Sequence, residues 1–241
     1  MKQLTIVGAG WAGLAAAVTA IQEGWRVRLF ESTHTPGGRA RSLPQNFAGQ
    51  PLDNGQHILI GAYRDTLALM RTVGLNPDEL LQRIPLDLRY ADGTGISLPD
   101  WPTPFNLLAG LSRAQGWTLK DKISLTQVAW SWQCAKFECD PTWTVHQLCH
   151  SAKLSATVIQ QLIEPLCLSA LNTAMHDASA AVFLRVLHDA LMGGKGSSDL
   201  LVPRVDLGAL FPNACLQWLS HQGADIQFGQ RVTATHLEEL Q

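Results

Sequence analysis

Three glycines and one acidic residue near the start of the chain have the spacing of a dinucleotide-binding motif. They are Gly8, Gly10, Gly13 and Glu31. In this motif the first glycine permits a tight turn, the second lets the backbone approach a pyrophosphate, and the third allows a helix to pack closely on a strand. The carboxylate of Glu31 can accept both hydroxyls of an adenosine ribose and repels a 2′-phosphate, which disfavours a ligand of the NADP type.

The neighbouring sequence predicts the elements that must position these residues. Leu4–Val7 predicts a short strand, the Ala-rich run to Glu23 predicts a helix, and residues 27–31 predict a second strand. The backbone N–H groups of Trp11 and Ala12 at the helix start then face the phosphates. The partial positive charge there favours an anion by about 0.3–1 kcal/mol.

Composition limits the function classes. With 241 residues the chain can form one or two domains, and its net charge of −2 argues against a nucleic-acid partner. The uncharged run Leu4–Ile21 raises the alternative of a membrane-spanning helix, but the glycine spacing and the strand that follows argue against it. A cytoplasmic location and reduced cysteines are therefore expected. No metal site is predicted, because His146, Cys149 and His150 lack a fourth ligand at a suitable spacing.

A second glycine-rich segment follows Glu31. Pro36, Gly37 and Gly38 break regular structure and let the backbone lie close to a ligand, while Arg39 and Arg41 add guanidinium groups suited to a diphosphate. Together with the first motif, this Gly-Gly-Arg segment resembles the FAD-binding entrance of the flavin amine oxidase and phytoene desaturase superfamily. The resemblance implies FAD as the cofactor.

Other stretches resemble a narrower group, the hydroxysqualene dehydroxylases of hopanoid synthesis, which are squalene-associated FAD-dependent enzymes. They are Leu52–Tyr63, Pro165–Thr173, Phe183–Leu187 and Ser198–Leu207. The resemblance covers nearly the whole chain and implies an FAD-dependent oxidoreductase that removes the allylic hydroxyl of hydroxysqualene to give squalene. The substrate would then be a long apolar C30 isoprenoid. A related flavin desaturase or amine oxidase, and a catalytically incompetent N-terminal fragment, are the alternatives.

The resemblance also implies individual site residues. Gly55, Gln56 and His57 are expected at the flavin, and the backbone of Val232 at the adenine. His57 is the candidate proton donor to the departing hydroxyl, since an imidazole suits proton delivery near neutral pH. Two alternatives stay open: His57 can equally fix its own loop by a hydrogen bond, and Val232 can be a plain buried strand residue.

The expected fold class is α/β, a Rossmann-like FAD-binding domain with a largely helical substrate domain inserted. Residues 1–99 form the first part of the FAD-binding domain and carry a substrate-domain hairpin at 86–98. Residues 100–200 form the helical domain, and residues 201–241 return to the FAD-binding domain. Helical spacing of apolar residues, as in Leu125, Val128 and Trp132, supports the helical assignment.

Two expectations concern partners. The apolar run 104–111 is a candidate for peripheral contact with the cytoplasmic face of a membrane, where a long lipid substrate would be admitted. Members of the resembled family continue into further strands and a closing helix at the flavin. We therefore expect this chain to be truncated relative to them, with the remaining wall of the site supplied by a separate C-terminal half chain or lacking.

Overall fold

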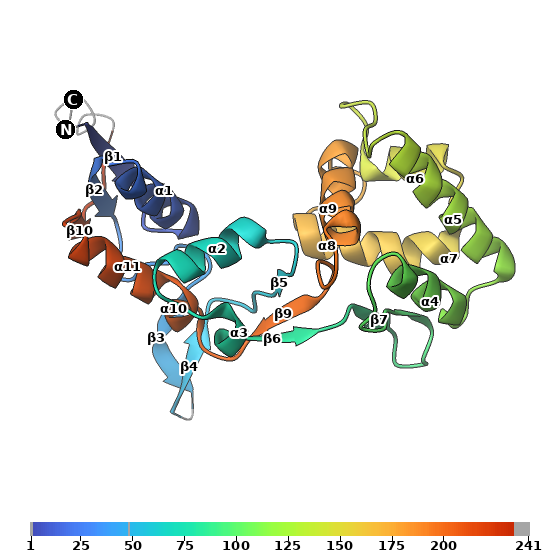
Figure 1. Cartoon of the computed structure of the whole chain (residues 1–241), viewed down its shortest axis with the longest axis horizontal. Helices are drawn as coiled ribbons and strands as arrows, with labels where there is room; N and C mark the ends of the chain where they lie inside the picture. Colours follow the sequence, from blue (N-terminus) through green and yellow to red (C-terminus); the bar gives the residue numbers. More distant parts are fainter. Residues whose placement is uncertain (1, 48, 234–241) are drawn as a thin grey trace. The chain divides into compact units, whose positions relative to one another are not determined.

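The contacts within the computed structural model, which describes residues 2–47 and 49–233, divide the chain into two units (Figure 1). The nucleotide unit comprises Met1–Leu59, Tyr63–Arg83 and Leu201–Gln241, and the helical unit comprises Ile60–Ala62 and Ile84–Leu200. The helical unit includes the hairpin at 86–98, whose apolar residues pack into its core.

A parallel three-stranded sheet is the centre of the nucleotide unit. Its strands are β1 (Gln3–Val7), β2 (Arg26–Glu31) and β10 (Asp225–Phe228), in the order β1-β2-β10. Residues 3–7 pair with 26–30, and residues 225–228 pair with 28–31. Parallel neighbours need a crossover, which α1 (Trp11–Gln22) provides between β1 and β2. The predicted strand, helix and second strand, and the α/β class, are confirmed.

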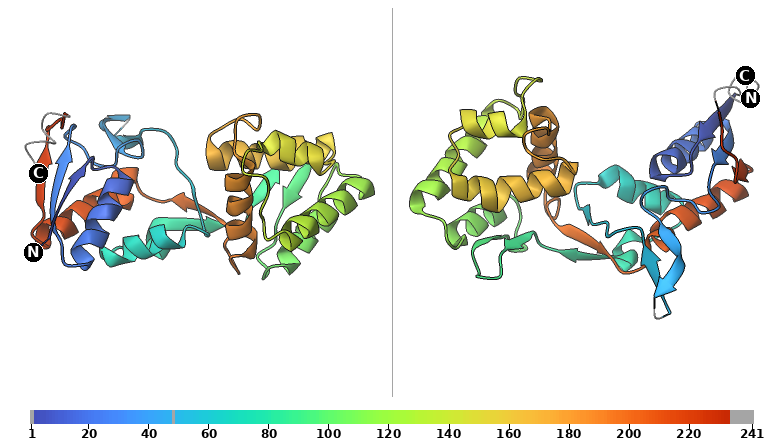
Figure 2. Two further views of the ribbon diagram at one scale, coloured as in Figure 1. Left: turned by 90° about the horizontal axis from the view of Figure 1, so that it is seen from above. Right: turned by 180° about the vertical axis from the view of Figure 1, so that it is seen from behind.

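Helices α1 and α11 (Pro212–His221) lie on the same face of this sheet (Figure 2). The ring centroids of Trp11 and Phe211 are 4.8 Å apart. Leu14 of α1 and Leu219 of α11 are buried in one hydrophobic core. Residues 212–221 thus pack in the same domain as the residues near the start of the chain.

The remaining short elements lie wholly or partly in this unit, since one residue of each of β5, β6 and β9 is counted with the helical unit. They are β3 (Ser42–Phe47), β4 (Gln50–Asp53), β5 (Leu59–Ile60), α2 (Arg64–Thr72), α3 (Pro77–Leu80), β6 (Leu81–Ile84), β9 (Leu200–Pro203) and α10 (Leu207–Leu210). β3 and β4 form an antiparallel pair, and a second small sheet has the order β5-β9-β6. Helix α2 ends just before Gly74, whose φ of +86° is the left-handed conformation that commonly closes a helix.

The helical unit has one hairpin and a succession of helices. Its elements are β7 (Asp87–Arg89), β8 (Gly95–Ser97), α4 (Phe105–Arg113), α5 (Leu119–Cys134), α6 (Val145–Ser151), α7 (Ala156–Val158), the π-helical turn η1 (Ile159–Ile163), α8 (Glu164–Leu171) and α9 (Ala180–Met192). Capping boxes start α5 at Thr118 and α6 at Thr144. The core contains fully buried Val158, Phe183 and Leu184. In the part of the chain that the structure describes, no helix is long and apolar enough to cross a bilayer.

Apolar residues at four-residue steps over 154–166, which are Leu154, Val158, Leu162 and Leu166, are typical of one regular α-helix. In the structure the backbone is helical from α7 to α8, but it contains the π-helical turn η1. Pro165, near the start of α8, has no N–H to donate to the carbonyl of Gln161, and the wider turn of η1 directly precedes it. Apolar periodicity alone does not reveal this irregularity, because a π-turn shifts the helical register by only one residue.

Candidate functional site

The first glycine loop has the geometry that a dinucleotide motif needs. Gly8 has a φ of +103°, and its N–H donates to the carbonyl of Phe30 at 2.7 Å, which fixes the turn at the end of β1. A Cβ on Gly13 would lie 1.9 Å from the carbonyl oxygen of Gly8. Only a glycine at position 13 therefore lets α1 pack this closely on the loop.

The second glycine segment lies directly against the first. The N–H of Gly37 donates to the carbonyl of Ala9 at 2.8 Å, and a Cβ on Gly38 would be 3.1 Å from the Cα of Gly10. The indole N–H of Trp11 donates to the carbonyl of Ala40 at 3.0 Å. The two segments thus form a cradle of bare backbone of the kind that a pyrophosphate can approach.

Helix α1 begins at this cradle. Gly10 is its N-cap residue, and no side chain of the described residues caps the helix there. The first N–H groups, those of Trp11 and Ala12, therefore have no intrahelical or side-chain acceptor at the helix start. With the helix dipole they offer hydrogen bonds and positive potential to an anion in the cradle.

Glu31 is buried at the carboxyl end of β2, beside the glycine loop. Its Oε2 accepts from the N–H of Ala9 at 2.7 Å, and its Oε1 accepts from the N–H of Thr33 at 2.8 Å. The hydroxyls of Ser32 and Thr33 lie 3.2 Å and 2.9 Å from Oε1. The Thr33 hydroxyl has one proton and also lies 2.8 Å from the carbonyl of Thr35. It can turn to that acceptor and leave the carboxylate room for a ribose hydroxyl.

These contacts predict a pH dependence of stability. Burial acts to raise the pKa of Glu31, but the hydrogen bonds from Thr33, Ala9 and Ser32 outweigh it and hold the pKa below its usual 4.5. A lowered pKa in the folded state stabilises the fold above the unfolded-state pKa, and this stabilisation is lost as pH falls through the folded-state value. As the pH is lowered through and below 4.5, the free energy of unfolding should therefore fall more in the wild type than in Glu31→Gln. Urea unfolding at a series of pH values measures this difference, and parallel curves for the two proteins would contradict it.

An unpaired guanidinium nitrogen marks the same region. The Nε of Arg41 is buried and has no hydrogen-bond partner among the described residues. A buried donor without an acceptor destabilises a fold by about 1–3 kcal/mol, so a ligand oxygen at this nitrogen would be favoured. The side chain of Arg39 is exposed. The cradle, the uncapped helix start and the unpaired Arg41 nitrogen together fit the diphosphate of FAD.

The loop expected at the flavin is tied to this cradle. Asn54 donates from its backbone N–H to the carbonyl of Arg41 at 2.9 Å, and from Nδ2 to the carbonyl of Arg39 at 3.0 Å. Gly55 has a φ of +83°, and the side chain of Gln56 is exposed. The Nδ1 of His57 is 3.1 Å from the carbonyl of Gly55, which is the geometry of the loop-fixing alternative. The proton-donor role of His57 stays a prediction.

A carboxylate cluster beside this loop was not predicted. The hydroxyl of Ser42 lies 3.0 Å from Asp53 Oδ1 and 2.5 Å from Asp206 Oδ1, and it accepts from the N–H of Gly208 at 2.9 Å. Burial acts to raise the pKa of Asp206, while hydrogen bonds from Ser42 and from backbone N–H groups lower it overall. The cluster joins the start of β3 and the end of β4 to the start of α10. Asp206 before an apolar run is an N-cap signal that could have indicated one of its members.

The segment that precedes Val232 is hydrogen-bonded to the backbone around Glu31. Gln230 donates from its N–H to the carbonyl of Glu31 at 2.9 Å, and Gly229 donates to the carbonyl of Thr33 at 3.2 Å. Val232 itself is half-buried in an irregular segment. Residues 229–233 form no strand in the structure, residues 234–241 lie outside the described part of the chain, and the adenine contact stays a prediction.

Comparison with known proteins identifies a family of flavin-dependent oxidoreductases over nearly the whole chain. The sequence profile of the family "Flavin containing amine oxidoreductase" matches residues 11–239. Hydroxysqualene dehydroxylases from Zymomonas mobilis subsp. mobilis and Rhodopseudomonas palustris are 28% and 27% identical, over 98% and 97% of this chain and 55% and 54% of their own lengths. The chain therefore spans about half the length of these curated relatives.

Solved structures agree at the level of the fold. An oxidoreductase from Methanosarcina mazei matches with a TM-score of 0.66 at 20% identity, over 96% of this chain and 52% of that one. Cyclohexylamine oxidase from Brevibacterium oxydans matches with a TM-score of 0.64 at 16% identity, over 96% of this chain and 51% of that one. The cofactor predicted from the glycine motifs, FAD, and the class of FAD-dependent oxidoreductases are both supported by the family profile. With a profile match that covers nearly all of its residues, the chain belongs to the flavin-containing amine oxidoreductase family.

Proposed function

We propose that the protein takes part in the reductive dehydroxylation of hydroxysqualene to squalene with FAD as the cofactor. The observation that carries the proposal is the similarity of almost the entire chain to three hydroxysqualene dehydroxylases, at 24–28% identity. The similarity extends through the helical unit and is not confined to the nucleotide motifs that many flavoproteins share.

The residues of this chain would have separate roles in cofactor binding and proton transfer. Gly10, Gly38 and the start of α1 bind the diphosphate, with Arg41 as a further donor, while Glu31 orients the adenosine ribose. When bound, reduced FAD supplies the hydride. Hydroxysqualene gains this hydride and one proton and loses water, and His57 is the proposed source of the proton. The helical unit, which is rich in Leu, Trp and Phe, is the proposed source of apolar contacts with the isoprenoid chain.

A related carotenoid desaturase is the second candidate. Hydroxyneurosporene desaturase from Rhodobacter capsulatus is 40% identical over 100 residues, which is 39% of this chain and 19% of that protein. This match is closer than the others named here but much shorter. A desaturase would remove hydrogen from an isoprenoid and need oxidised FAD, whereas a dehydroxylase needs reduced FAD, so the required redox state separates the two.

The test begins with the absorption spectrum of the protein purified after incubation with FAD. We expect a retained flavin spectrum and, after anaerobic reduction, conversion of hydroxysqualene to squalene when the chain is co-expressed with a second chain that supplies the part of the curated relatives it does not span. Gas chromatography follows the product, and the chain assayed without that partner is expected to hold FAD poorly and give no sustained turnover. Heat-denatured protein with reduced FAD is the control for chemistry without the site. Conversion of a carotenoid precursor by oxidised FAD, or of an amine, with hydroxysqualene untouched, would overturn the dehydroxylase proposal.

A further inference from the structure

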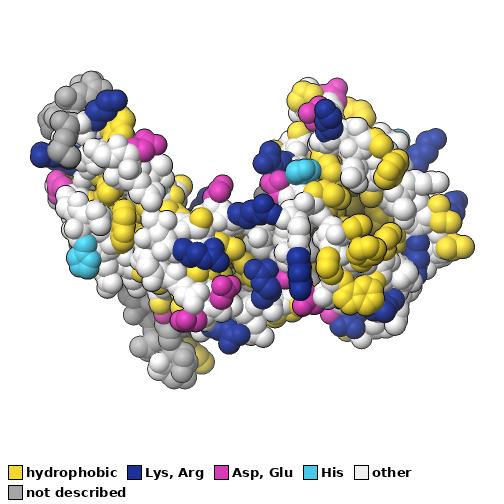
Figure 3. Space-filling view, in the orientation of Figure 1, with side chains coloured by type: hydrophobic (Ala, Val, Ile, Leu, Met, Phe, Trp, Pro, Cys, Tyr) yellow, Lys and Arg dark blue, Asp and Glu magenta, His cyan; other side chains and the backbone are white. Residues whose placement is uncertain are grey.

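Helix α4 in the helical unit presents apolar side chains to solvent and buries a polar one. Phe105 is 63% exposed and Leu108 56%, whereas Asn106 is 5% exposed. Trp101, just before the helix, is 46% exposed. Leu107 and Leu111 of the same helix pack against the core of the helical unit, so α4 carries apolar residues toward the core and also toward solvent. A helix that only covers a core has polar residues on its outer face. In Figure 3 hydrophobic side chains gather on the face of the helical unit that carries α4, with Lys and Arg side chains among them.

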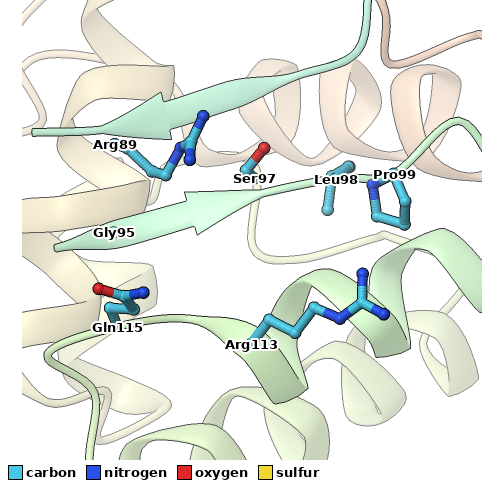
Figure 4. A pocket seen from close by; sticks show the side chains of 7 residues that line it. All are labelled: Arg89, Gly95, Ser97, Leu98, Pro99, Arg113 and Gln115. Atoms are coloured by element: carbon cyan, nitrogen blue, oxygen red, sulfur yellow. The ribbon is translucent and has the colours of Figure 1, made fainter. Parts of the chain in front are cut away.

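A cation adjoins one of these apolar residues, Trp101. The guanidinium carbon of Arg113, at the end of α4, lies 5.4 Å from the centre of the Trp101 ring. Arg113 also lines a cavity of about 280 Å³ on β7, β8 and α4 (Figure 4). The lining residues are Arg89, Gly95, Ser97, Leu98, Pro99, Arg113 and Gln115.

The cavity has a positive charge that the described residues do not balance. Arg89 is paired with Asp87, and its hydrogen bonds and charge hold the pKa of Asp87 below its usual value. None of the salt bridges found among the described residues involves Arg113. The carboxylate of Asp100, beside Trp101, is paired with Lys195 at 3.5 Å. Of the two arginines that line the cavity, Arg113 is therefore the one whose charge can bind an anion from outside the protein.

Further basic residues lie close by on α5. Between residues 101 and 135 the charged side chains are Arg113, Lys120, Asp121 and Lys122, and Asp121 is buried in the capping box of α5. The Nζ of Lys122 donates to the carbonyl of Ser112 at 2.8 Å, which places this ammonium group at the end of α4. Exposed aromatic and leucine side chains beside basic groups are the combination that binds an anionic lipid interface.

We propose that the α4 surface, formed by Trp101, Phe105, Leu108 and Arg113, docks on an anionic phospholipid bilayer. The three apolar side chains enter the headgroup region, and the cavity beside Arg113 takes a lipid phosphate. Helix α4 has 9 residues, so it lies on the bilayer and does not span it. A second copy of the chain is a poorer occupant, because a symmetric contact would bring two positively charged surfaces together.

Docking would give the enzyme access to a substrate that resides in the bilayer, but the inference itself rests only on contacts within the helical unit. Vesicle binding can therefore be absent in a protein that binds FAD and removes the hydroxyl, and it can be present in a protein that does neither.

The test is co-sedimentation of the protein with phosphatidylcholine vesicles prepared with and without phosphatidylglycerol. We expect binding that increases with the anionic lipid, and at least about tenfold weaker binding for Leu108→Glu, which puts a charge in place of an inserted apolar group. Leu168→Glu is the matched control, since Leu168 is a leucine on another helix of the same unit and is 57% exposed. Its binding should stay within about twofold of the wild type.

A second variant tests the phosphate cavity. Arg113→Gln should weaken binding to the anionic vesicles about fivefold and leave binding to neutral vesicles unchanged. Circular dichroism establishes that each variant is folded. Equal losses in the two leucine variants, binding independent of the anionic lipid, or no vesicle binding by the wild type would each overturn the proposal. Sedimentation velocity tests the alternative of a second copy of the chain. If the wild type is a dimer that does not bind vesicles, and Leu108→Glu dissociates this dimer, the proposal is wrong.

Discussion

Gly13→Ala is expected to lower the free energy of unfolding of the nucleotide unit by about 2–3 kcal/mol. A Cβ at this position would lie 1.9 Å from the carbonyl oxygen of Gly8 and 3.5 Å from the Cγ2 of Ile6. Alanine in a helix is favoured over glycine by about 1 kcal/mol, which acts in the opposite direction. The overlap is with backbone that β2 fixes through Phe30, so relief requires a shift of α1, and overpacking of this kind outweighs the helix preference.

Gly10→Ala is the matched control for this effect on stability. Gly10 has φ −71° and ψ 170°, which any residue can adopt, and a Cβ there would be 3.8 Å from its nearest neighbour, the Cα of Gly38. Urea unfolding monitored by circular dichroism should therefore give a lower free energy of unfolding for Gly13→Ala than for Gly10→Ala, although both glycines belong to one motif. If Gly13→Ala is as stable as Gly10→Ala, the close approach of α1 to the glycine loop is not required for the fold.

Gly10→Val is expected to weaken FAD and ADP binding by at least about 100-fold while the protein remains folded. The valine side chain would stand in the cradle between the two glycine segments and displace the pyrophosphate from the N–H groups at the start of α1. Loss of two hydrogen bonds to a charged group corresponds to at least about 3 kcal/mol, which is more than 100-fold in affinity. Isothermal titration calorimetry with ADP measures the adenosine half of the site without the flavin.

Ala16→Val is the control for a valine elsewhere on α1, because Ala16 lies on the exposed face of the same helix. Its ADP affinity should match the wild type. Undiminished binding by Gly10→Val, with its fold verified by circular dichroism, would mean that the diphosphate is bound somewhere other than this cradle.

The sequence by itself determined the local elements of the nucleotide site. Position 8 requires glycine because its φ is in the left-handed region, and position 13 requires glycine because there is no room for a side chain beside the carbonyl of Gly8. Both requirements arise within one short strand-turn-helix segment. The hairpin at 86–98 was predicted as well, and in the structure it turns at Asp92 and Gly93. Turn chemistry and apolar periodicity act over a few residues, so they can be read from the order of the residues alone.

Only the tertiary structure decided which distant segments meet. The contact of Gly38 with Gly10, the hydroxyl of Ser42 between Asp53 and Asp206, and the unpaired Nε of Arg41 each depend on how loops fold back on the sheet. The outward direction of Phe105 and Leu108 was likewise not determined by the sequence. An apolar helix face indicates that some apolar surface is needed, but whether the core or another partner provides it depends on packing against the rest of the domain.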